Sequence, residues 1–259
     1  MQYNVRYCCE ILEGYVLSNS NSFNDVLKGI GKFVLTLQRI DWEKISNNAI
    51  PILKFLDNLP EYTRRIHCKL ASNGWFLIGE VELNKFPEIM KASDEILDKI
   101  MTDFTNDHLD SIVTSIYEAF PHRAKIIQKA VEAHNNELFE LSVPVFLIQA
   151  DGISSEILNV SFFSKRNGKP KTGEAKLAVI EADIDEISTE YYYRLLPLDM
   201  LTSLNKNTDD LQEYEEGILN RHNVIHGHDC DYGSITNSSK GIILLKYLTD
   251  LKDYTLSVS

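Results

Sequence analysis

Several features that would assign a function at once are scarce or absent in this sequence. Its four cysteines form no Cys-x-x-Cys pair, so we expect neither a disulfide framework nor a zinc site built from closely spaced thiolates. It contains no Gly-x-x-x-x-Gly-Lys-Ser/Thr, no Gly-x-Gly-x-x-Gly and no Gly-x-Ser-x-Gly pattern. These absences leave nucleotide-driven and serine-hydrolase chemistry without support.

Uninterrupted apolar runs and basic residues are also in short supply. No such run approaches the ~20 residues that cross a bilayer, and residues 1–6 lack the basic-then-apolar order of a secretion signal. We therefore expect a cytoplasmic protein with no membrane contact. Lys and Arg number 26 against 38 Asp and Glu, which gives a formal net charge of −12. This balance argues against a protein that coats nucleic acid, but it permits one local basic patch.

Apolar residues recur three and four positions apart along most of the chain, which is the spacing of one helix face. The first stripe consists of Phe23, Val26, Leu27, Ile30, Phe33, Val34 and Leu37, and later stripes run from residue 84 onward to Ile242, Leu245 and Leu248. A length of 259 residues and a hydrophobic content of 44% suffice for a buried core. The sequence therefore predicts an all-α protein.

Residues 164–173 are the clearest loop, because two glycines and a proline interrupt regular structure there. The loop carries four basic residues and no acid: Lys165, Arg166, Lys169 and Lys171. These side chains are candidates for phosphate contacts with RNA. The alternative is a charged loop that is simply solvated.

A histidine-rich segment precedes Gly227, and glycine just after the last helical residue is a common helix stop. We therefore predict that the penultimate helix, with Leu211, Tyr214 and Ile218 on its apolar face, ends at His226. The free carbonyl groups of a helix end favour a cationic imidazolium, and such a histidine can transfer protons near neutral pH. Arg221 brings a planar cation suited to phosphate oxygens.

On a straight helix, five positions correspond to about 140° of rotation, from ~100° per residue. The side chains of Arg221 and His226 therefore do not share one face of an ideal helix. They can converge if the helix distorts at Gly227, or if one site is assembled from two copies of the chain.

The surrounding sequence resembles the C-terminal part of HEPN proteins of bacterial defence systems. The matching runs are Asn220 to Gly227, Asp231-Tyr232-Gly233, Asn237-Ser238-Ser239-Lys240 and the apolar segment 242–248. That superfamily carries an Arg-x4–6-His motif, often with a polar residue after the arginine; Arg221, His222 and His226 match it. The resemblance implies a HEPN-like helical bundle over residues 106–259, preceded by a helical N-terminal region over residues 1–105.

The same resemblance implies a metal-independent endoribonuclease without a cofactor, with its site at a homodimer interface. His226 would transfer protons while a ribose 2′-hydroxyl attacks the adjacent phosphorus, and Arg221 would stabilise the charge of the transition state. Asn223 is a candidate for orienting the phosphate. The implied partners are RNA, a second copy, and an antitoxin or defence-system protein in an anti-phage or toxin role.

Two alternatives stay open. A HEPN-like bundle can bind RNA or a protein without cutting. His222 and His226, four residues apart, can face one metal ion with His228, Asp229 and Asp231 nearby, although no His-Glu-x-x-His pattern is present. Two other polar positions have structural interpretations: His134 as a hydrogen-bonded core histidine, and Asp151-Gly152 as a turn or helix irregularity.

Overall fold

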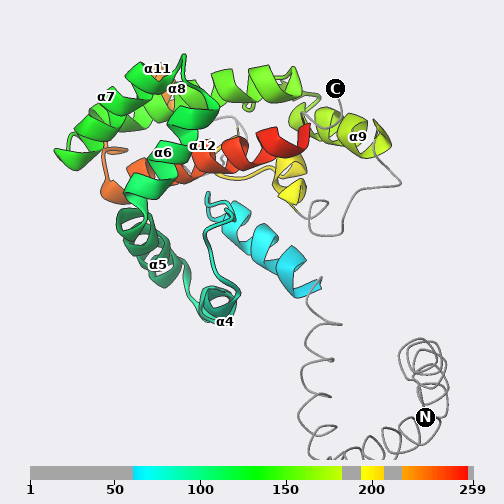
Figure 1. Ribbon diagram of the computed structural model, residues 1–259, viewed down its shortest axis with the longest axis horizontal. Helices are drawn as coiled ribbons and strands as arrows, with labels where there is room; N and C mark the ends of the chain where they lie inside the picture. The colour runs from blue at the N-terminus through cyan, green and yellow to red at the C-terminus, as the bar shows by residue number, and fades with distance from the viewer. Residues whose placement is uncertain (1–60, 183–193, 207–217, 256–259) are drawn as a thin grey trace, which may run out of the picture. The chain divides into compact units, whose positions relative to one another are not determined.

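The computed structural model describes residues 61–182, 194–206 and 218–255 (Figure 1). The chain divides into two compact units, Met1–Asn58 and Leu59–Ser259. The first unit, with the predicted stripe from Phe23 to Leu37, lies outside the described residues, as does the segment around Leu211 and Tyr214. The boundary expected near residue 105 therefore stays a prediction.

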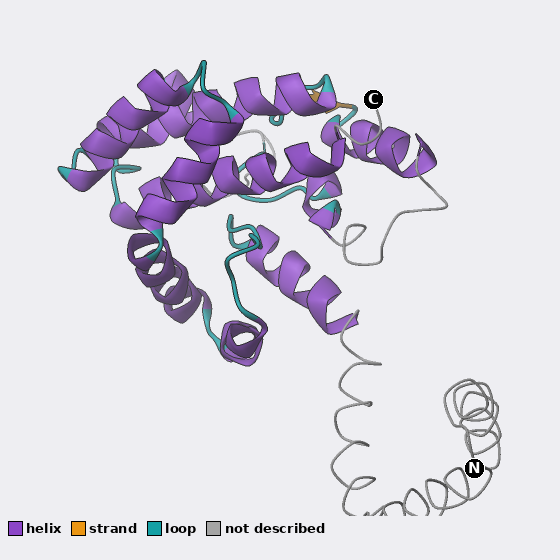
Figure 2. Cartoon of the chain, in the orientation of Figure 1, coloured by secondary structure: helices purple, strands orange, loops and turns teal. Residues whose placement is uncertain are grey.

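The described part of the chain is mainly helical, which confirms the predicted all-α class (Figure 2). Residues 61–72 are helical, and the helices that follow are α4 (Phe86–Lys91), α5 (Asp94–Asp107), α6 (Leu109–Ala119), α7 (Ala124–Asn135), α8 (Phe139–Leu158), α9 (Thr172–Ala182), α11 (Arg221–His226) and α12 (Ile235–Thr255). Two 3-10 turns, η1 (Leu83–Lys85) and η2 (Leu196–Asp199), join them.

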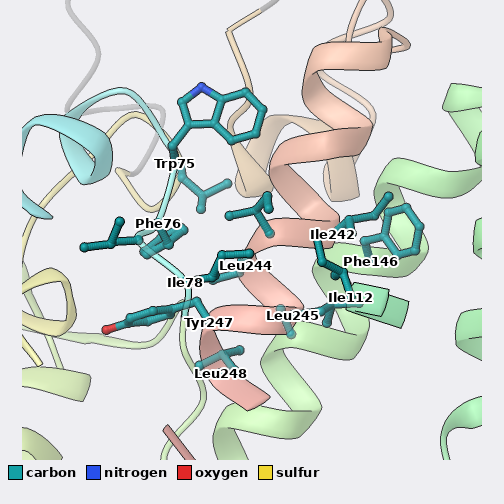
Figure 3. Close-up of a cluster of buried hydrophobic side chains, with 14 of the residues drawn as sticks. Trp75, Phe76, Ile78, Ile112, Phe146, Ile242, Leu244, Leu245, Tyr247 and Leu248 are labelled. Atoms are coloured by element: carbon teal, nitrogen blue, oxygen red, sulfur yellow. The ribbon is translucent and has the colours of Figure 1, made fainter. Parts of the chain in front are cut away.

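Helix α12 lies at the centre of the core and contacts α5, α6 and α8, while α8 also packs against α7. Buried side chains leave α12 on more than one side (Figure 3). Tyr247 stacks on Phe76 with ring centroids 4.8 Å apart, and Ile242 lies on the side of Phe146. A helix that is apolar on all sides is stable only when neighbours surround it, which explains why this segment takes the central position.

Two lysines on α12 are nevertheless buried, and carboxylates from other segments pair with them. The Lys240 amine lies 3.0 Å from a carboxylate oxygen of Asp98, and the Lys246 amine lies 2.9 Å from Glu80. Burial alone lowers the pKa of Lys246, but the carboxylates of Asp250 and Glu80 outweigh it and leave that pKa raised. A buried charge of this kind is tolerated only with such partners.

Helix α8 begins at Phe139 and contains Pro144 inside it. It continues through Asp151 and Gly152, so the turn considered at that pair does not form. By length and composition α8 is apolar enough to cross a membrane, and half of its most apolar stretch is buried inside the protein. The core helix of a soluble protein has the same composition, and the contacts of α8 with α7 and α12 are of that kind.

The expected loop at 164–173 contains the two described strands, β1 (Lys165–Arg166) and β2 (Lys169–Pro170), paired antiparallel. Asn167 and Gly168 join them, with φ angles of 52° and 74°. Positive φ at both central residues defines the tight turn that Asn-Gly favours. The segment is therefore a short hairpin, so the expectation of an irregular loop is wrong at these residues.

Candidate functional site

The Arg-x4-His segment forms a helix of its own, α11, rather than the end of a longer one. Residues 218–220 are not helical, and Asn220 is extended, with φ −130° and ψ 120°. Its side-chain oxygen accepts a hydrogen bond of 3.0 Å from the backbone N–H of Asn223, as a helix N-cap does. The predicted helix running into Arg221 is therefore wrong at 218–220, because the side chain of Asn220 starts a new helix there.

Asn220 is buried and also ties α11 to a distant loop. Its amide nitrogen donates to the carbonyl oxygens of Ser203 at 2.7 Å and Lys206 at 2.9 Å. The backbone N–H of Arg221 donates to the Leu204 carbonyl at 3.1 Å. These bonds fix the start of α11 and thereby the position from which the arginine side chain leaves the backbone.

The other end of α11 agrees with the sequence. Gly227 has φ +70° and is the C-cap of the helix, which confirms the predicted stop after His226. The chain then folds back, since the N–H groups of His228 and Asp229 donate to the Asn223 carbonyl at 2.8 and 3.3 Å. This return brings His228 beside the histidines of α11.

Three imidazoles gather at this end of the helix. The ring centroid of His222 lies 4.4 Å from that of His226 and 5.9 Å from that of His228, and those of His226 and His228 are 6.2 Å apart. His226 and His228 are exposed and His222 is half-buried. The cluster therefore places two exposed imidazole rings beside a half-buried one.

Arg221 occupies a different environment, against α8 and the segment after it. Its guanidinium carbon lies 5.5 Å from the ring centroid of Phe163, and one nitrogen lies 3.8 Å from a carboxylate oxygen of Asp151. Helices α11 and α8 contact one another (Figure 1), and the Arg221–Asp151 pair joins them. Within one chain, the structure thus brings His226 together with His222 and places Arg221 with Asp151.

Asn223 is 1% exposed, so its side chain does not lie on the accessible surface. Its backbone groups take part in both ends of α11, since the N–H meets the Asn220 cap and the carbonyl receives His228 and Asp229. The observed role of Asn223 is structural. Contact of its amide with a phosphate stays a prediction.

The four basic residues of the hairpin are spread along its two strands and the start of α9. Arg166 is exposed and pairs with Glu174 at 3.2 Å, Lys169 is exposed, and Lys165 and Lys171 are half-buried. An open groove of about 320 Å³ lies beside the hairpin. Its lining residues are Leu158, Asn159, Val160, Arg166, Lys171, Glu174 and Ala175. The hairpin begins two residues after Phe163, the ring that Arg221 faces.

His134 lies in the core, away from the histidine cluster of α11. His134 is buried, and its Nδ1 lies 2.8 Å from the hydroxyl of Ser238, so the prediction of a hydrogen-bonded core histidine is confirmed. Burial lowers the pKa of His134, because a buried site disfavours the charged ring. Across the described ranges, no group of three or more His, Cys, Asp or Glu side chains is arranged to hold a metal ion.

Sequence reasoning did not connect Asp151 or Phe163 with Arg221, and it did not anticipate the dual role of Asn220. Asp151 and Phe163 lie far from Arg221 in the sequence, so no spacing rule connects them to it. Asn220 carried a usable signal, because asparagine is a favoured N-cap residue; the apolar stripe upstream outweighed it.

In comparisons with known proteins, no family model, no curated protein and no solved structure matches this chain. The case for a function therefore depends on the geometry of the residues themselves and on the motif resemblance.

Proposed function

We propose that the protein is a cytoplasmic, metal-independent endoribonuclease that acts as a homodimer, in an anti-phage or toxin role. One observation carries the proposal: the Arg-x4-His segment is an autonomous helix, capped at both ends, with Arg221 as its first residue and an exposed His226 as its last. The hydrogen bonds of buried Asn220 hold this six-residue helix in place and thereby fix the backbone positions of these two residues.

In the proposed reaction a ribose 2′-hydroxyl loses its proton and attacks the adjacent phosphorus, and the 5′-oxygen leaves with a proton. The products are a 2′,3′-cyclic phosphate and a 5′-hydroxyl end. His226 carries out proton transfer, with His222 beside it at a ring distance of 4.4 Å. Arg221 stabilises the extra negative charge on the phosphorane-like transition state.

The divergence of the two key side chains supports the proposed homodimer. Arg221 faces Phe163 and Asp151, whereas His226 packs with His222 and His228. A second copy placed across this surface brings the arginine of one subunit toward the histidine of the other. The hairpin residues Lys165, Arg166, Lys169 and Lys171 supply the local positive charge that an acidic protein needs to bind RNA.

The decisive experiment incubates purified protein with total cellular RNA in EDTA and follows cleavage on a denaturing gel. Wild type should cut, and His226→Ala and Arg221→Ala should lose about 10²–10⁴-fold in rate, as removal of a general acid–base or an electrostatic group does. His228→Ala is the matched control, because it removes an exposed ring of the same cluster that is outside the motif. A substrate with a single 2′-deoxy position should resist cleavage at that position.

A second candidate is a HEPN-like subunit that binds RNA or a partner protein without cutting. The net charge of −12 favours it, as do the acidic partners of Arg221 and Arg166. Under this reading wild type leaves all RNA intact in EDTA, yet copurifies with an antitoxin-like protein or retains a defined RNA. Equal cleavage by wild type and both motif variants would instead place the activity elsewhere in the chain.

A further inference from the structure

Asp151 is a charged residue in the most apolar helix of the described chain, and both of its carboxylate oxygens have partners. Oδ1 accepts hydrogen bonds from the Ser161 hydroxyl and, at 3.2 Å, from the backbone N–H of Phe163. Oδ2 lies 3.8 Å from Nη2 of Arg221. A partly buried carboxylate is stable with such partners, so the position holds two neighbouring segments at once.

The two segments meet at the guanidinium. The Asp151 bonds hold the segment after α8 in place, and that segment carries the Phe163 ring on which Arg221 lies at 5.5 Å. The arginine is therefore bounded by a negative charge and by an aromatic face. Its side chain is 31% exposed, so part of the donor fork still faces solvent. A guanidinium has five N–H donors, and a contact at 3.8 Å leaves donors available for a ligand.

We propose that Asp151 is a positioning residue for Arg221, which orients the guanidinium toward the scissile phosphate by acting on it from two sides. The negative charge of Oδ2 orients the Arg221 guanidinium. The hydrogen bonds of Oδ1 hold the segment that carries the Phe163 ring, on which the guanidinium lies. The catalytic readout of this inference rests on the proposed ribonuclease function. An ion pair that is already formed lowers the cost of ordering the arginine when RNA binds.

Three variants separate this role from simple anchoring of the segment. Asp151→Asn keeps an oxygen that can accept from Ser161 and Phe163 but removes the charge beside Arg221. Ser161→Ala removes one anchoring bond and keeps the charge. Arg221→Lys keeps a cation and loses the planar fork. Asp151→Asn should lower kcat by about 10- to 100-fold with little change in KM, whereas Ser161→Ala should stay within about threefold of wild type. Equal losses in the two variants, or full activity in Asp151→Asn, would overturn the proposal.

A second readout does not require cleavage. In the ¹H–¹⁵N spectrum of the full chain, the Arg221 Nε–Hε signal is assigned by its loss in Arg221→Lys. It should be resolved and slow to exchange in wild type and in Ser161→Ala, and it should join the signals of exposed arginines in Asp151→Asn. An unchanged signal in Asp151→Asn rejects the positioning role. If wild type cuts no RNA, the ribonuclease proposal fails, and this spectrum alone decides the role of Asp151.

Discussion

The hydroxyl of Tyr232 donates a hydrogen bond of 3.0 Å to the carbonyl oxygen of Glu140. Glu140 lies four residues before Pro144, and proline has no N–H to give to that carbonyl. The segment that follows α11 thus supplies the donor that α8 lacks. This bond satisfies the carbonyl that Pro144 leaves open and joins the segment after α11 to α8.

Tyr232→Phe removes only this donor. It should lower the free energy of unfolding by about 1 kcal/mol, measured by urea denaturation at pH 7.

Burial raises the pKa of Tyr232, and the negative charges of Glu140, Asp229 and Cys230 add to that rise. A raised phenol pKa means that the stabilisation is complete below the ordinary tyrosine pKa of about 10 and is lost as the pH rises through the folded value. The variant should therefore lose less stability than wild type above pH ~10.

Asn220 gives a graded test of the α11 cap. Asn220→Ser keeps an N-cap oxygen for Asn223 but loses both donors to the 203–206 loop, and Asn220→Ala loses all three bonds. At about 1 kcal/mol for each buried hydrogen bond, stability should fall by about 2 kcal/mol in the serine variant and about 3 kcal/mol in the alanine variant. Identical stabilities for the two variants would show that the cap contributes nothing.

The buried ring of His67 should make the free energy of unfolding fall as the pH is lowered. Burial, aided by the Arg194 charge, lowers its pKa to about 3, and neither ring nitrogen has a hydrogen-bond partner among the described residues. Because the folded pKa is depressed, the stabilisation is present above pH ~6.5 and is lost as the pH falls toward about 3. Relative to His67→Leu, wild type should lose about 2 kcal/mol between pH 8 and pH 5. Parallel pH curves for the two proteins would contradict the buried neutral ring.

The proposed dimer can be tested on the outer face of α8. Leu141 and Ile148 are 61% and 52% exposed, lie two helical turns apart on one face, and lead toward Asp151 on the same helix. The double change Leu141→Asp and Ile148→Asp should convert a dimer into a monomer in sedimentation equilibrium and abolish cleavage. Ile96→Asp, at a residue 55% exposed on α5, is the matched control and should remain dimeric. A double variant that stays dimeric places the interface elsewhere.

The basic hairpin makes a prediction about salt. Lys169→Ala with Lys171→Ala should weaken binding to an RNA carrying 2′-deoxy substitutions, and should reduce the slope of log affinity against log salt by about 1.5. The control is Lys85→Ala with Lys129→Ala, two lysines paired with glutamates within their own segments. An unchanged slope would show that the hairpin lysines are solvated and do not contact RNA.

The sequence allowed the helical class, the stop at Gly227 and the core position of His134 to be predicted, because each depends on a local pattern. Helical spacing, a glycine at positive φ and a polar residue on an apolar stripe all leave their signal within a few residues. The start of α11 was missed, since the apolar stripe upstream concealed the capping role of Asn220. The hairpin was missed although Asn167-Gly168 is the usual signal for one.

The partners of Arg221 could not be predicted from the sequence, for a different reason. Asp151 lies in α8 and Phe163 in the segment after it, and only the packing of α11 against α8 makes them neighbours of Arg221. No periodicity encodes that contact.

The central place of α12 has a consequence for how the protein is made. The described helices that pack on α12, namely α5, α6 and α8, all precede it in the chain, so the ribosome synthesises them before their common partner. Until residues 235–255 emerge, the apolar faces of those helices are open to chaperones and to other nascent chains. A chain truncated before Ile235 would therefore lack the helix at the centre of its core, and we expect it to be degraded rather than to act as a smaller functional protein.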